Sequence, residues 1–135
     1  MNKGLQAEIK QTIPFPRLSA EALLSIVRTA AILDHEMNDA LKPFGITATQ
    51  FNVLRILRGA GETGLCGREI GERLVARVPD VPRLLDRMAA MNLIRRERDP
   101  EDRRHVTTTI TAKGLEFVTL VTPSLEVVEK ARMGR

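Results

Sequence analysis

The spacing of the apolar residues changes at Asn92, and this change constrains the fold more than any other feature. On its N-terminal side the apolar residues recur at steps of three and four, namely Val81, Leu84, Leu85, Met88 and Met91. This period predicts an amphipathic helix over residues 79–91. On its C-terminal side the pattern alternates, so residues 93–98 and 103–111 predict two strands around the polar turn 99–102. The segment therefore predicts a helix followed directly by a β-hairpin.

Two prolines locate the start of that helix. The first four backbone N–H groups of a helix have no intrahelical acceptor, so Pro79 and Pro82 are tolerated there. We expect the helix to begin near Pro79 or Asp80. Asn92 tolerates the left-handed conformation that ends many helices, so we expect it to close this one.

A long helix is predicted near the N-terminus. Residues 1–17 contain two prolines and predict a loose arm. An amphipathic helix follows, capped by Ser19 and closed by Pro43 and Gly45. Its apolar stripe consists of Leu23, Ile26, Val27, Ala30, Leu33, Met37 and Leu41. A stripe of this length needs a partner surface.

Two more helices are predicted between that helix and the one before the hairpin. Thr47 and Gln50 have capping-box spacing and start a helix that Gly59 ends. A short helix then carries Ile70 and Leu74.

The segment after the hairpin is also helical. Thr111 caps a helix that Pro123 interrupts, and Ser124 caps a last short helix. The fold class is thus mainly α with a small β-hairpin wing, and the length fits one compact domain.

Composition narrows the class of partner. No apolar run is long enough to cross a bilayer, and the N-terminus mixes charge with proline, so we expect a cytoplasmic protein. The net charge is +4, and residues 77–113 hold 9 basic against 6 acidic residues. Arginine outnumbers lysine by 16 to 5, which suits bidentate contact with phosphate and guanine, although a GC-rich genome would enrich arginine equally.

Two short helices followed at once by a hairpin are typical of a winged helix-turn-helix protein, whose second helix enters the major groove of DNA. Arg77, Arg83 and Arg87 supply a basic face for that helix. The hairpin carries Arg95, Arg96, Arg98, Arg103, Arg104 and His105, which suit phosphate contact or a narrow minor groove. The acidic residues Asp99, Glu101 and Asp102 either orient these arginines or form a solvated turn of mixed charge.

Residues 41–117 resemble the MarR (multiple antibiotic resistance) family of regulators. The matching segments, in order, are ITATQFNVLRIL, EIGERL, VPDVPRLLDRM, NLIRRERDPEDRR and ITAKG. The resemblance implies DNA contacts from the start of the recognition helix, at Asp80, Val81, Pro82 and Arg83, with Arg87 one turn later. In the wing it implies that Asp102 orients Arg104 into the minor groove, with Arg103 beside it.

The resemblance also implies an assembly and a mode of regulation. Members are typically homodimers, so residues 18–45 and the C-terminal helices 112–135 are expected to dimerise around the DNA-binding region 46–111. We expect a repressor that binds a pseudo-palindromic operator, with relief by a small aromatic or phenolic effector whose pocket no motif records. Pro82 replaces the usual Thr or Ser, Asn92 replaces a glycine, and the C-terminal helix is short.

Other functions fit the sequence less well. Cys66 could sense oxidants, but a small side chain packing at a turn is the simpler interpretation. His35 and His105 lie in poor settings for a metal, and no cofactor or catalytic motif is present, so we expect no enzyme. A winged helix used only for protein contacts is the main alternative, but Arg83 and Arg87 argue against it. Proteins that bind single-stranded nucleic acid stack its bases on aromatic side chains. Trp and Tyr are absent here, and the four phenylalanines lie in the arm or at expected core positions, which argues against this class.

Overall fold

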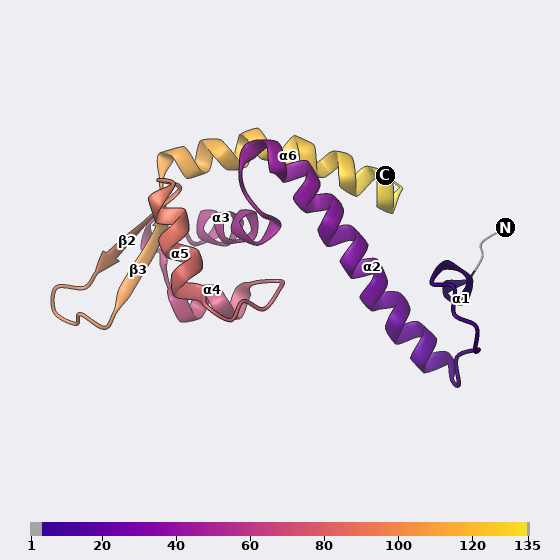
Figure 1. Ribbon diagram of the computed structural model, residues 1–135. Helices are drawn as coiled ribbons and strands as arrows, with labels where there is room; N and C mark the ends of the chain where they lie inside the picture. Colours follow the sequence, from indigo (N-terminus) through magenta and orange to yellow (C-terminus); the bar gives the residue numbers. More distant parts are fainter. Residues whose placement is uncertain (1–3, 135) are drawn as a thin grey trace. The chain divides into compact units, whose positions relative to one another are not determined.

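The computed structural model describes residues 4–134, which form mainly helices and a three-stranded antiparallel sheet (Figure 1). The chain divides into two compact units, Met1–Glu36 and Met37–Arg135. The boundary lies within the long helix α2, Leu18–Leu41. None of the helices over residues 4–134 has both the length and the apolar character that a membrane span needs.

The first unit contains α1 (Leu5–Glu8) and most of α2. The expected loose arm was wrong in part, because the arm contains α1, which an ion pair of 3.5 Å between Glu8 and Arg28 joins to α2. The expectation of Ser19 as N-cap was also wrong. The first turn of α2 closes on the carbonyl of Arg17, which accepts from the N–H groups of Ala20 and Glu21.

The apolar stripe of α2 is exposed in the first unit. Leu23, Ile26 and Val27 have 62%, 68% and 57% of their surface accessible. At the other end of the helix, Leu41 is fully buried in the core of the second unit. Leu41 is therefore the one member of the stripe that is fully buried.

The second unit begins with η1 (Lys42–Phe44), α3 (Ala48–Ala60) and η2 (Gly61–Thr63). The predicted capping box is confirmed, since Thr47 accepts from the N–H of Gln50 and the Gln50 side chain accepts from the N–H of Thr47. The predicted end at Gly59 was wrong. The helix continues to Ala60 and stops at Gly61, whose φ of +64° breaks the helical path.

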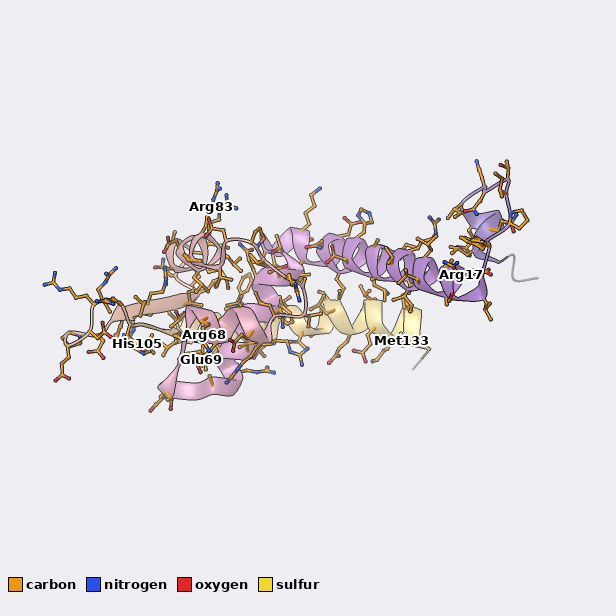
Figure 2. All side chains as sticks on the ribbon, turned by 90° about the horizontal axis from the view of Figure 1, so that it is seen from below. Arg17, Arg68, Glu69, Arg83, His105 and Met133 are labelled. Atoms are coloured by element: carbon orange, nitrogen blue, oxygen red, sulfur yellow. The ribbon has the colours of Figure 1, made fainter. Side chains whose placement is uncertain are left out.

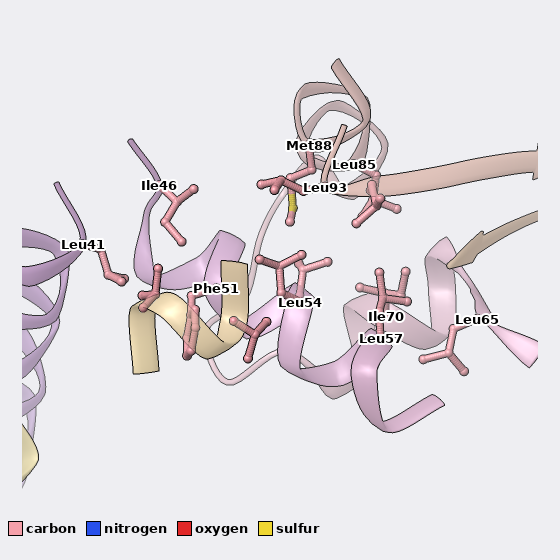
Figure 3. Close-up of a cluster of buried hydrophobic side chains, with 14 residues drawn as sticks. Leu41, Ile46, Phe51, Leu54, Leu57, Leu65, Ile70, Leu85, Met88 and Leu93 are labelled. Atoms are coloured by element: carbon pink, nitrogen blue, oxygen red, sulfur yellow. The ribbon is translucent and has the colours of Figure 1, made fainter. Parts of the chain in front are cut away.

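Helix α3 lies at the centre of the hydrophobic core (Figure 3). It contributes Phe51, Val53, Leu54 and Leu57, all buried. Around them pack Leu41, Ile46, Leu65, Ile70, Leu85, Met88, Leu93, Ile94, Val118 and Val121. The core therefore joins α3 to segments of the second unit that precede and follow it in the chain.

The sheet has the order β1-β3-β2, all antiparallel, with β1 Leu65–Cys66, β2 Ile94–Arg98 and β3 Val106–Ile110. The hairpin of β2 and β3 confirms the predicted wing. Strand β1 was missed, because two residues are too few to show alternation. It runs close to β3, and a Cβ on Gly64 would lie 2.6 Å from the carbonyl oxygen of Thr108.

Helix α4 spans Gly67–Arg73 and α5 spans Val81–Ala90. The predicted start of α5 is confirmed at Asp80, its N-cap, while Pro79 lies outside the helix. Asn92 has a φ of +61°, which confirms the predicted left-handed residue after this helix.

Helix α6 is one continuous helix, Ala112–Met133, so the predicted interruption at Pro123 was wrong. Thr111 caps it as predicted and accepts from the N–H of Gly114 at 3.0 Å. Val118 and Val121 are buried before the proline, and Leu125 packs on the core after it. This packing on both sides offsets the one hydrogen bond that proline removes.

Candidate nucleic-acid interface

Helices α4 and α5 form the helix pair, and residues 74–80 connect them. The connection is held to α3, because the backbone N–H of Val75 donates to Oδ1 of Asn52 at 2.9 Å. At the start of α4, Oε1 of Glu69 accepts from the backbone N–H of Cys66 at 3.1 Å, and this bond lowers the pKa of the Glu69 carboxyl. Both ends of the first helix of the pair are therefore fixed.

Helix α5 has a buried face and a basic outer face. Leu85 and Met88 are fully buried against the core. Arg83 and Arg87 lie one turn apart on the exposed side, and Figure 2 shows Arg83 projecting away from the helix. This is the arrangement that a helix needs if it is to lie in the major groove.

The carboxylate of Asp80 caps α5. Its Oδ1 accepts from the backbone N–H of Arg83 at 3.0 Å. An aspartate in this position stabilises the folded protein by about 1 kcal/mol, and its negative charge interacts favourably with the positive end of the helix dipole. The cap fixes the first turn, where Val81 is half-buried and Pro82 is exposed.

The C-terminal end of α5 is tied to the start of α6, which the sequence analysis did not predict. Nζ of Lys113 donates to the carbonyl of Met91 at 2.9 Å, and Oγ1 of Thr111 donates to that of Asn92 at 2.7 Å. The Thr111 N–H also donates to the carbonyl of Leu93 at 3.1 Å. A cation suits this end, because it carries the negative pole of the helix.

The tip of the wing is ordered by its own backbone. The N–H of Asp99 donates to the carbonyl of His105, and the N–H of His105 donates to the carbonyl of Asp102, each at 2.9 Å. Oδ1 of Asp102 accepts from the backbone N–H of Arg104 at 3.1 Å. The structure thus brings Asp102 and Arg104 together, but through the backbone of Arg104 and not through its guanidinium.

The wing arginines differ in their surroundings. Arg103 and Arg104 are exposed at the tip, and the carbonyl of Arg103 accepts from Nη1 of Arg98 at 3.0 Å. Arg95 pairs with Glu97 at 3.1 Å. Arg96 is only 23% exposed, and its Nη1 donates to Oδ1 of Asp86 on α5.

Most of the predicted contact residues are therefore exposed on the helix pair and the wing. Exposed members of the predicted set are Arg77, Asp80, Pro82, Arg83, Arg87, Arg103 and Arg104. Arg96 stands apart from them, since its guanidinium is occupied within the molecule.

A groove of about 490 Å³ beside β1 was not predicted. Cys66, Glu69, Arg73, His105 and Thr107 are among its lining residues. The side chains meet there only because β1 pairs with β3, and no motif records that pairing. Over residues 4–134 no three His, Cys, Asp or Glu side chains are arranged to hold a metal ion.

A short helix pair with a basic second helix, followed by an antiparallel wing, defines a winged helix-turn-helix protein. The model of the MarR family matches residues 46–106. The chain is 29% identical over 118 residues to YkoM, an uncharacterised HTH-type transcriptional regulator of Bacillus subtilis, covering 87% of this chain and 71% of that protein.

Two solved structures have the same fold. The MarR transcription factor from Planctomyces limnophilus is 30% identical with a TM-score of 0.78, over 90% of this chain and 87% of that one. Reduced AbfR bound to DNA is 25% identical with a TM-score of 0.72, over 82% and 80% of the two chains. The chain belongs to the MarR family of transcription regulators.

Proposed function

We propose that this regulator binds duplex DNA with α5 in the major groove and the wing on the neighbouring minor groove. The observation that carries the proposal is the outer face of α5, where Arg83 and Arg87 stand exposed above a fully buried Leu85 and Met88. Arg77 in the connection and Arg103 and Arg104 at the wing tip extend the same basic surface. The relative AbfR, solved on DNA, supports this assignment.

We further propose that the chain acts as a homodimer. The exposed apolar side chains of α2, with Leu120 and Val127 of α6, are what a second copy would cover. A two-fold dimer binds two half-sites about one helical turn apart, so the operator would be a pseudo-palindrome of roughly 10 bp spacing. In this proposal the protein is a cytoplasmic repressor, and a small aromatic or phenolic effector relieves the repression.

The wing contact is tested with Arg104→Ala. A neutralised phosphate releases counterions, so losing one contact lowers the slope of log K against log salt by about 1. The measurement is a titration of a selected operator at several salt concentrations. Arg55→Ala is the matched control, since it removes the same charge from an exposed site on α3 outside the proposed contacts and should leave the slope unchanged.

The two variants separate the outcomes. An unchanged slope for Arg104→Ala refutes the wing contact. If the wild-type chain binds no duplex at all, the fold serves protein contacts instead. Sedimentation at micromolar concentration tests the dimer, and a monomer there contradicts it.

A further inference from the structure

We propose that Arg96 is not a DNA contact but a positioning residue, whose bond to Asp86 sets the angle of the wing against the recognition helix. The inference rests on the proposed DNA binding and reassigns one residue of its predicted contact set.

Strand β2 alternates between two faces. Ile94 and Arg96 share the inner face, since successive side chains point to opposite sides, and Ile94 is 2% exposed. Arg95 and Glu97 share the outer face, where they form their own ion pair. The stem of Arg96 therefore begins on the side of the sheet that faces the core.

Arg96 lies directly opposite Thr108 in the register of β2 and β3. Thr108 is fully buried. Its Oγ1 and the Nε of Arg96 are both buried without a hydrogen-bond partner among the described residues. Cross-strand neighbours on one face are within reach of each other, so the two polar atoms lie on the same small buried surface.

This burial restricts where the guanidinium can go. A buried polar group is costly unless it is bonded, and over residues 4–134 Asp86 is the one hydrogen-bond partner of the Arg96 guanidinium, through Nη1. To reach a phosphate, Arg96 would have to break that bond. Its neighbours Arg95 and Arg98 are exposed, so water or phosphate can replace their bonds to Glu97 and to the carbonyl of Arg103 at little cost.

The Asp86 side of the bridge lies on α5, where its carboxylate is 70% exposed. The chain joins α5 to β2 through Asn92 and Leu93, and Ile94 packs in the core at the base of the hairpin. The bond between Asp86 and Arg96 lies two residues further along β2, so it restrains the part of the hairpin beyond that base against α5. The spacing between Arg87 on the helix and Arg104 on the wing then stays fixed before DNA arrives.

Asp86→Asn tests the bridge while keeping the shape of the side chain. We expect operator affinity to fall roughly tenfold, the scale of one charge-assisted hydrogen bond, with the salt slope unchanged. In the free protein, the hairpin amides should exchange with solvent faster. Glu97→Gln is the matched control, because it makes the same charge change on the other face of β2, and neither effect should appear.

Arg96→Gln gives the opposing test. If Arg96 is a positioning residue, this variant weakens binding without changing the salt slope, and combining it with Asp86→Asn adds little. A slope lowered by about 1, as for Arg104→Ala, would show a phosphate contact and overturn the proposal. So would Asp86→Asn with unchanged affinity and unchanged exchange. If the wild-type chain binds no duplex, the DNA-binding proposal fails, while the exchange experiment still decides whether the bridge orders the wing.

Discussion

Gly114 is a residue at which adding a single methyl group should destabilise the fold. It lies in the first turn of α6, above the base of the wing. A Cβ there would lie 2.2 Å from the carbonyl oxygen of Leu93 and 2.7 Å from Cγ1 of Ile110. Carbon and oxygen normally approach no closer than ~3.3 Å, so α6 or the strand base must move by about 1 Å.

The movement is opposed from two sides. The Leu93 carbonyl is held by its bond from Thr111, and α6 is held by the buried Val118 and Val121. Overpacking of this kind costs roughly 1–3 kcal/mol, and we place Gly114→Ala at the upper end. The better helix propensity of alanine returns up to ~1 kcal/mol, which leaves a net loss of about 2 kcal/mol. The midpoint of thermal unfolding should fall by on the order of 10 °C.

The assay is thermal and urea unfolding of Gly114→Ala beside Gly59→Ala. Gly59 lies in α3, and a Cβ there meets no atom within 4 Å, so the same substitution should raise stability by up to ~1 kcal/mol. If both variants are as stable as the wild type or more so, the close approach of α6 to the wing base does not constrain the fold, and the reasoning fails.

Three further predictions concern the helix pair. Asp80→Ala should cost about 1 kcal/mol in urea unfolding through the lost cap, and Asp80→Ser should retain most of it; equal losses would contradict a capping role. Pro82→Ser should keep α5 intact, since Pro82 lies in its first turn, and should shift the base preference in a binding selection; identical selected sites would count against contact there. The pKa of Glu69 is lowered by the Cys66 N–H, so its contribution is present above the ordinary carboxyl pKa and is lost as the pH falls through the lowered value. Glu69→Gln should therefore reduce the drop in urea midpoint between about pH 6 and pH 3, and an undiminished drop would show that the bond contributes nothing.

Local rules predicted the parts of the fold that depend on neighbouring residues. Four features are each decided within one helical turn, namely Thr47 with Gln50, Asp80 between Pro79 and Pro82, Asn92 at positive φ, and Thr111 before α6. The same rules failed where packing outweighs them. Pro123 should end a helix by propensity, but the buried residues on both sides keep α6 continuous.

The candidate site divides in the same way. The exposed Arg83 and Arg87 could be predicted because helical spacing assigns both to the outer face of α5. The bridge between Asp86 and Arg96 could not, since it depends on the angle between a helix and a strand. Counting arginines in the wing therefore overestimates the charge available to DNA.

Pro123 leaves a mark on α6 even though the helix continues. Proline has no N–H, so the carbonyl of Thr119 receives no bond from it. Just before it, the hydroxyls of Thr119 and Thr122 donate to the carbonyls of Leu115 and Val118. Threonine bonds of this kind and a missing ladder bond both lower the stiffness of a helix. We therefore expect bending of α6 to concentrate in the segment around Pro123.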